Sequence, residues 1–313
     1  MTALSIGILT DHPFSAHLVE RLHAASVPLA VAALNQHDLV AGSLAQRVPH
    51  APVTPLGQTG GWRQALADWI DREQIQAVFV LSFAHRIPEQ LLKRPVHGFW
   101  NFHPGPLPDY RGADPVFWLI LEGARHGGLT VHRMDPDFDT GPIFQDIPVP
   151  LSPRDTHGTH LDALGRAAAE VGPALFQAIQ QSPAGSPPLR PQQHTGTAAR
   201  RRPQPADTCC DWHRDTASHI ARLARATNPT YGGAKFLYAG EPCQIFDAVA
   251  LPEKADTAPG TFALTQPDHL TVTCAEQSLL RLFTIGTAHG IFHAPSWFAE
   301  GASWNFPRQT PVT

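Results

Sequence analysis

The stretch AVFVLSF, residues 77–83, decides the fold of the first half of the chain, because its hydrophobic residues are consecutive rather than alternating. A strand with this pattern is covered on both faces, as in a parallel sheet that has helices on either side. Similar runs occur at SIGILT (5–10), PLAVAAL (28–34) and GFWNFH (98–103), and segments with helical periodicity lie between them at 15–25, 62–72 and 88–93. This alternation predicts an α/β domain with a doubly wound, mainly parallel sheet, which binds ligands beyond the carboxyl ends of its strands.

The second half of the chain has a different pattern. An alanine-rich helix that starts near Thr156 closes the first domain, and residues 182–205 are dense in Pro, Gly, Ser and Arg, which is typical of an extended connection. Beyond it, one helix at 215–226 and short strands separated by turn residues predict a small β-barrel. We therefore expect a first domain at residues 1–181, a linker at 182–205, a C-terminal β-barrel domain at 206–290 and a tail of unassigned role at 291–313.

The tail matches no motif, but it is rich in aromatic residues. We expect these side chains to pack on the barrel, because apolar side chains normally seek burial. They are Phe292, Trp297, Phe298, Trp304 and Phe306.

The overall composition restricts the class of protein. The 313 residues carry a formal net charge of -4, and no apolar run approaches the roughly 18 residues of a membrane-spanning helix. The start of the chain, MTALSIGILTDHPF, lacks the basic segment and cleavage site of a signal peptide, so we expect a cytoplasmic protein without membrane contact. The negative charge argues against a nucleic-acid partner, because no basic field is available to attract a polyanion.

Neither a metal ion nor a dinucleotide is expected from the sequence. The four cysteines form no CxxC pair and the 18 histidines form no HExxH motif, so the cysteines are interpreted as reduced thiols and no metal site is predicted. The first strand is followed by TDHPFS rather than by the glycine-rich GxGxxG turn that binds a dinucleotide.

The stretch NFHPGPLPDYRGADPVFW, residues 101–118, follows a predicted buried strand and has the most informative polar residues. Asn101 and His103 point to the same side of an extended segment, so they can face one cavity. The prolines at 104, 106 and 108 stiffen the chain directly after the pair. An isolated pair of this kind is also compatible with a turn cap and a core histidine.

Two further segments place polar residues after apolar runs. SFAHRI (82–87) ends the strand quoted first, and MDPDFDTGPIFQ (134–145) contains three alternating carboxylates. Each alone could be an exposed turn. Because all three polar segments lie at or near the carboxyl ends of predicted strands, we expect them to line one crevice.

The blocks SFAHRI, NFHPGPLPDYRGADP and GLTVHRMDPDFDTGPI, in this order and spacing, resemble the formyltransferases that use 10-formyltetrahydrofolate. Residues 206–290, which begin near CCDW and include ATNPTYGGAKF, look like the C-terminal barrel of the methionyl-tRNA and sugar-nucleotide branch. The resemblance covers nearly the whole chain to about residue 290. It implies a Rossmann-like formyltransferase catalytic domain at 1–181, with 10-formyltetrahydrofolate as the formyl donor and no metal.

The resemblance also implies roles for single residues. The family's catalytic asparagine, histidine and aspartate fall on Asn101, His103 and Asp139. The residues that match its folate pocket are Phe83, His85, Arg86, Ile87, Asp137 and Thr140. Attack of an amine on the formyl group gives a tetrahedral intermediate with a developing oxyanion. We expect Asn101 and His103 to donate hydrogen bonds to this oxygen, and the Asp139 carboxylate to raise the pKa of His103.

The acceptor is less sharply defined by the sequence. Residues 35–57, where the methionyl-tRNA branch carries a basic insertion, contain one arginine, Arg47, which favours a small-molecule amine such as an amino-sugar nucleotide or an amino-acid-derived metabolite. The alternatives are methionyl-tRNA as acceptor, hydrolysis of formyltetrahydrofolate, and a scaffold without activity. The basic run Arg200 to Arg202 could meet a diphosphate or be a solvated part of the linker, and a homodimer is compatible with the sequence.

Overall fold

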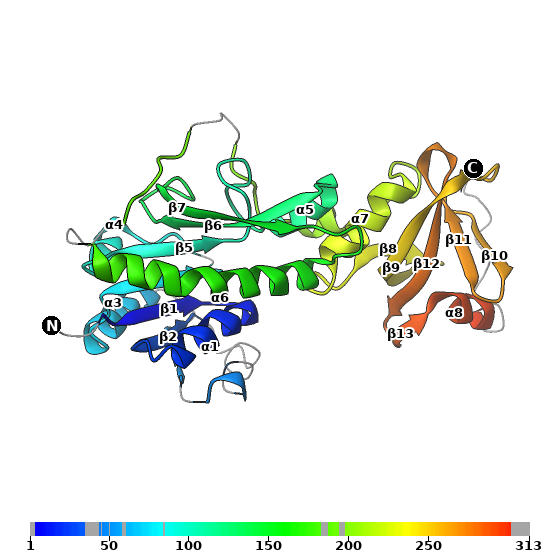
Figure 1. Cartoon of the computed structure of the whole chain (residues 1–313). Helices are drawn as coiled ribbons and strands as arrows, with labels where there is room; N and C mark the ends of the chain where they lie inside the picture. Colours follow the sequence, from blue (N-terminus) through cyan, green and yellow to red (C-terminus); the bar gives the residue numbers. More distant parts are fainter. Residues whose placement is uncertain are drawn as a thin grey trace. The chain divides into compact units, whose positions relative to one another are not determined.

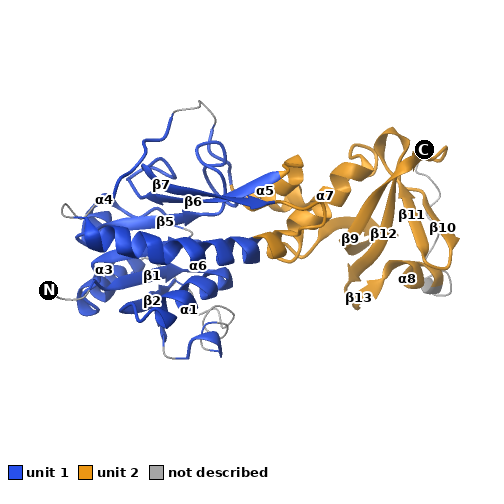
Figure 2. Cartoon of the chain, viewed as in Figure 1, with its two compact units in different colours: residues 1–115, 126–150, 161–201 blue, residues 116–125, 151–160, 202–313 orange. Residues whose placement is uncertain are grey.

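The computed structural model describes residues 4–34, 44, 46–49, 51–57, 61–83, 85–182, 187–193 and 198–301. The chain divides into two compact units, coloured separately in Figure 2. Unit 1 consists of residues 1–115, 126–150 and 161–201, and unit 2 of residues 116–125, 151–160 and 202–313. Among the described helices, none has the length and hydropathy needed to span a membrane.

Unit 1 is built on a seven-stranded sheet with the order β3-β2-β1-β4-β5-β6-β7 (Figure 1). The strands are β1 Ile6–Thr10, β2 Leu29–Ala33, β3 Val53–Pro55, β4 Ala77–Leu81, β5 Phe99–His103, β6 His126–Arg133 and β7 Ile143–Pro150. β1 to β5 are parallel, whereas β6 is antiparallel to β5 and β7 is antiparallel to β6. The mainly parallel α/β sheet predicted from the sequence is thus confirmed.

Helices form at the predicted segments 15–25, 62–72, 88–93 and from Thr156 onward, whereas two further helical segments, at 13–15 and 115–122, were not predicted. The helical segments associated with this sheet are η1 Pro13–Ser15, α1 Ala16–Ala24, α3 Trp62–Arg72, α4 Glu89–Leu92, α5 Pro115–Glu122 and α6 His157–Gln181. α3 and α4 pack on one face of the sheet, in an apolar cluster that includes Leu9, Val80 and Trp69. Trp69 approaches β1 closely because Gly7 has no side chain there: a Cβ on Gly7 would lie 2.6 Å from the Trp69 ring.

α6 packs closely on the first helical segment of the chain. A Cβ on Gly172 would lie 2.2 Å from Leu18 Cδ1, and one on Gly165 would lie 2.5 Å from the Phe14 carbonyl oxygen. Both glycines therefore let the backbone of α6 approach its neighbours more closely than an alanine would permit.

Unit 2 contains a six-stranded antiparallel sheet with the order β10-β11-β12-β9-β8, and β13 pairs with β12. Its elements are η2 Pro205–Thr208, α7 Ala217–Thr227, β8 Ala234–Tyr238, β9 Glu241–Lys254, β10 Phe262–Gln266, β11 His269–Thr273, η3 Ala275–Gln277, β12 Ser278–Thr287, β13 Gly290–His293 and α8 Ala294–Gly301. The end strands β8 and β10 meet through side chains, with Tyr238 and Phe262 ring centroids 5.2 Å apart. The sheet therefore curls back on itself, as expected of a small barrel.

Part of the tail packs on this sheet. Trp297 and Phe298 of α8 lie 5.0 and 6.2 Å from the Tyr238 ring, centroid to centroid, which confirms the expected packing for these two residues. Trp304 and Phe306 lie outside the described residues.

Candidate active site

Strand β5 carries two of the predicted site residues. Its apolar side chains Phe99, Trp100 and Phe102 are buried, and the parallel register with β4 pairs Val80 with Asn101. Asn101 and His103 therefore share the face of the sheet on which Val80 lies, as their spacing predicts. His103 is 3% exposed, so its ring is enclosed by protein.

Asp139 lies on the loop between β6 and β7. The path by which this loop reaches Asn101 and His103 was not predicted from the sequence. We expected this loop at the carboxyl edge of a parallel sheet, but β6 runs antiparallel to β5 and pairs Asn101 with His132 and His103 with Thr130. The loop starts beside Phe99 and has to fold back towards Asn101 and His103. Asp139 has a left-handed backbone with φ of 54°, a conformation that few residues other than glycine adopt without strain.

A glycine allows the loop to take this path. Gly141 sits directly against the end of β6, where an added Cβ would lie 1.8 Å from the Arg133 carbonyl oxygen. No side chain fits at this position, so the return of the loop towards β5 depends on glycine.

The three residues meet in one hydrogen-bonded cluster. The Asn101 side-chain amide donates to Asp139 Oδ1 at 3.1 Å, and His103 Nδ1 lies 3.5 Å from the same oxygen. The second carboxylate oxygen, Oδ2, accepts a hydrogen bond from the backbone N–H of Gly112 at 2.8 Å. The structure thus brings together Asn101, His103 and Asp139, which were chosen from segments separated by up to 38 residues in sequence.

The surroundings of His103 determine where its ring carries a proton and how readily it is charged. Nε2 lies 2.7 Å from the Tyr110 carbonyl oxygen, which only accepts, so Nε2 carries a proton. Burial, the strongest single influence, disfavours the charged ring, but the charge and hydrogen bond of Asp139, with the Tyr110 carbonyl, outweigh it and raise the pKa of His103. Burial likewise opposes ionisation of Asp139, but the charge and the hydrogen bond of His103 hold the pKa of this carboxyl well below its ordinary value.

His132 is a member of the cluster that the sequence reasoning missed. Its Nδ1 lies 3.1 Å from the Arg133 carbonyl oxygen and must donate to it, which leaves Nε2 to accept from the Asn101 amide at 3.2 Å. His132 is 1% exposed. Its place opposite Asn101 follows from the antiparallel register of β6, so recognising that strand pairing would have revealed it.

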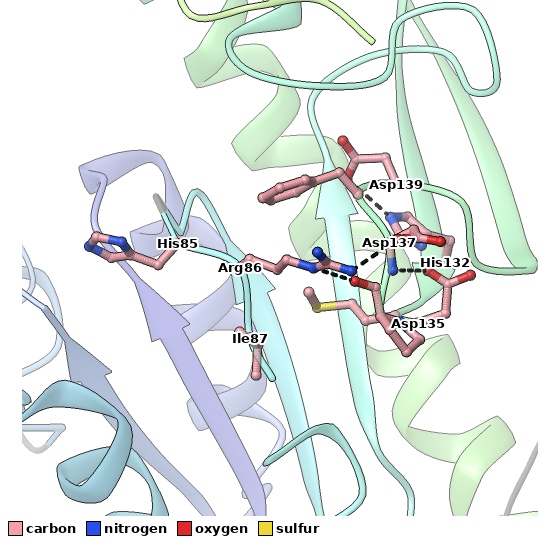
Figure 3. Close-up of a pocket in the computed structure, with 10 residues that line it drawn as sticks. His85, Arg86, Ile87, His132, Asp135, Asp137 and Asp139 are labelled. Atoms are coloured by element: carbon pink, nitrogen blue, oxygen red, sulfur yellow. Dashed lines mark hydrogen bonds and ion pairs between the residues drawn. The ribbon is translucent and has the colours of Figure 1, made fainter. Parts of the chain in front are cut away.

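A pocket lies beside this cluster, and most of the residues predicted to bind folate line it (Figure 3). The pocket is lined by His85, Arg86, Ile87, His132, Met134, Asp135, Pro136, Asp137, Phe138 and Asp139. Arg86 crosses it, donating to the Pro136 carbonyl oxygen at 2.6 Å and to Asp137 Oδ1 at 3.0 Å, as the dashed lines show. The lining combines apolar surface with acceptor oxygens, which suits a flat, donor-rich heterocycle.

Two predicted pocket residues stand outside this lining. Phe83 packs against the Trp62 ring, with centroids 5.4 Å apart, and it borders the apolar cluster under α3. The Thr140 hydroxyl donates to Asp135 Oδ1 at 2.6 Å and so stabilises the loop itself. In this structure both residues contact other protein groups and do not line the pocket.

Comparison with known proteins identifies the family of the chain. The model of a family described as formyl transferase matches residues 5–175, and that of the formyl transferase C-terminal domain matches residues 203–301. The chain belongs to the formyl transferase family. Asn101, His103, Asp139 and the residues that line the pocket lie within the part matched by the first model.

Relatives within this family include methionyl-tRNA formyltransferases. That of Stenotrophomonas maltophilia (strain K279a) is 32% identical over 207 residues, which are 66% of this chain and 66% of the relative. That of Burkholderia pseudomallei (strain 668) is 30% identical over 215 residues, 69% of this chain and 64% of the relative. The alignments thus span slightly less than two thirds of the length of these relatives.

Solved structures share the fold at lower identity. The N-formyltransferase of Helicobacter canadensis, in complex with folinic acid and dTDP-3-aminofucose, has a TM-score of 0.65 and 15% identity over 90% of this chain and 99% of its own. HypX from Aquifex aeolicus, in complex with tetrahydrofolic acid, has a TM-score of 0.69 and 15% identity over 98% of this chain and 48% of its own. At this level of identity the likeness concerns the fold.

Proposed function

We propose that this formyltransferase-family protein transfers the formyl group of 10-formyltetrahydrofolate to the amine of a small-molecule acceptor. The observation that carries the proposal is the buried cluster of Asn101, His103 and Asp139 beside a pocket in the matched domain. A donor amide, an imidazole with a raised pKa and a low-pKa carboxylate are the groups that amine attack on an amide-like carbonyl needs.

In the proposed reaction each residue has a separate task. Asn101 donates a hydrogen bond to the formyl oxygen as negative charge develops there, exchanging one of its present acceptors for this oxygen. Both ring nitrogens of His103 face Tyr110 and Asp139, so His103 supplies positive charge beside that oxygen rather than the hydrogen bond expected from the sequence. Asp139 keeps the imidazole charged, and the proton that the attacking amine loses passes through Asp139 or a water molecule to N10 of the donor as the tetrahedral intermediate collapses and the bond from the formyl carbon to N10 breaks.

The pocket lining supports the donor assignment. The pterin ring of the donor presents several N–H groups, which the Pro136 carbonyl and the Asp137 carboxylate can accept once they release their present bonds to Arg86. Ile87 is 2% exposed and offers an apolar floor. His85, Arg86 and Asp137 therefore remain our proposed donor contacts, whereas Phe83 and Thr140 would act by supporting the wall.

A small-molecule acceptor is favoured by the charge of the chain. The formal net charge is -4, which gives no general attraction for the phosphates of a tRNA. The names of the sequence relatives favour a second candidate, methionyl-tRNA, whereas the H. canadensis structure of the same fold contains an amino-sugar nucleotide. We also propose that the protein is cytoplasmic.

The proposal is tested by following the absorbance of tetrahydrofolate released from 10-formyltetrahydrofolate. Nucleotide-linked amino sugars, amino acids, hydroxylated ornithine and methionyl-tRNA are supplied in turn, with His103→Ala as the control. We expect release that depends on a small amine and is lost in the variant. Release with methionyl-tRNA alone would favour the second candidate, and release without any acceptor would favour a hydrolase.

A further inference from the structure

The segment between the two matched domains crosses the loop between β6 and β7 that carries Asp139, which we call the catalytic loop. Arg190 exchanges two backbone hydrogen bonds of 2.8 Å with Ile143 at the start of β7, and its guanidinium pairs with Asp146. Farther along, the Arg200 carbonyl accepts from the backbone N–H of Ala113 at 2.9 Å. Residues 187–193 and 198–201 therefore belong to unit 1, beside the loops that hold the site. The sequence had indicated an extended connection and gave no sign of these contacts.

Between these attachments, Gln192 points its carboxamide at the catalytic loop. Its Nε2 donates to the Asp139 carbonyl oxygen at 2.9 Å and to the Gly141 carbonyl oxygen at 2.7 Å. Its Oε1 accepts from the Arg111 guanidinium at 3.1 Å. Because a guanidinium only donates, Arg111 determines which end of the carboxamide faces the loop.

These contacts hold both the side chain and the backbone of Asp139. The backbone N–H of Gly112 binds its carboxylate, and Gln192 binds its carbonyl and that of Gly141, two residues farther on. Asp139 needs such support, because its left-handed backbone, with φ of 54°, is costly for a residue with a side chain. Without the two bonds from Gln192, the loop could relax and carry the carboxylate away from His103 and Asn101.

We propose that Gln192 is a positioning residue for the reaction, which keeps the Asp139 carboxylate against His103 and Asn101, and that Arg111 orients it. The expected fall in kcat rests on the proposed function. The position of the Asp139 carboxylate against His103 and Asn101 does not depend on that function. Gln192 binds the catalytic loop at the backbone carbonyls of Asp139 and Gly141, so we expect its effect on the reaction to pass through Asp139.

The test uses Gln192→Met, which keeps the length and neutrality of the side chain and removes both donors. Gln193→Met is the matched control, because Gln193 is exposed one residue farther on. The primary measurement is the pKa of the His103 imidazole by NMR titration in the full-length protein, with its signal assigned by comparison with His103→Gln. Neither donor nor acceptor is needed for this measurement.

We expect His103 to titrate at lower pH in Gln192→Met than in wild type, because burial then acts without the carboxylate beside it, and to be unchanged in Gln193→Met. With an acceptor, kcat should fall about fivefold or more, as two hydrogen bonds are lost, while KM for the acceptor stays the same. If Gln192→Met does not fold, Gln192→Asn, which is one methylene too short to reach both carbonyls, serves instead.

Two results would overturn the proposal. One is a His103 titration in the folded Gln192 variant that matches wild type, and the other is an unchanged kcat. Absence of formyl transfer by the wild-type protein would instead contradict the proposed function, and the titration would still decide whether Gln192 positions Asp139.

Discussion

Replacing Asp139 by asparagine removes the negative charge that faces His103 and nearly preserves the shape of the side chain. At the observed separation of 3.5 Å, two unit charges attract each other by about 5 kcal/mol at an effective dielectric constant of about 20. In wild type this attraction, with the hydrogen bonds, outweighs the burial that opposes the charged ring. In Asp139→Asn only the burial and the Tyr110 carbonyl remain, so the pKa of His103 should fall and the ring should be neutral at pH 7.

The kinetic consequence follows from the role proposed for the charged ring. Loss of one preorganised group that stabilises a developing oxyanion costs about 2.7 to 4 kcal/mol, so kcat should fall by about 100- to 1,000-fold. The measurement is acceptor-dependent tetrahydrofolate release, combined with NMR titration of His103. Asp109→Asn, an exposed carboxylate one residue before Tyr110, is the charge-matched control. A kcat for Asp139→Asn within about threefold of wild type would refute the reasoning.

Three other predictions concern the loop and its charges. Gly141→Ala should destabilise the protein by roughly 1 to 3 kcal/mol in denaturant unfolding, because the new methyl group meets the Arg133 carbonyl oxygen at 1.8 Å; a stability equal to wild type would show that the loop has another path. Arg86→Met should raise KM for the folate donor roughly fivefold, yet change stability by less than about 1 kcal/mol, because its pair with Asp137 is 58% and 77% exposed; an unchanged KM would remove Arg86 from the donor site. The depressed pKa of Asp139 contributes stability that is present above the ordinary value of 3.8 and is lost as the pH falls through the folded pKa. Acid titration should therefore reduce the unfolding free energy of wild type more than that of Asp139→Asn, and parallel curves would contradict the depressed pKa.

The elements with strong local patterns were predictable from the sequence. The helix at Trp62–Arg72 agrees with its expected bounds, because its apolar residues recur at helical spacing and the chain on either side breaks the pattern. The strand at Ala77–Leu81 is buried throughout, as its continuous apolar run predicts. The pair Asn101 and His103 was found for the same reason, since a strand fixes the direction of alternate side chains.

Features that depend on pairing between distant segments were not predictable in this way. The antiparallel direction of β6 is set by its partners β5 and β7, and a single sequence does not reveal it. His132 was missed as a result. The contact from Gln192 to Asp139 joins residues 53 positions apart, and no local sequence pattern predicts it.

The most direct test of the central claim follows the formyl carbon itself. 10-formyltetrahydrofolate labelled with ¹³C in the formyl group is incubated with the wild-type protein and the best acceptor from the panel, and ¹³C NMR identifies the product. We predict that the label appears in an N-formyl group on the acceptor and that His103→Ala leaves it in the donor. Label recovered as free formate, or left in the donor by the wild-type protein with every acceptor, would contradict the account.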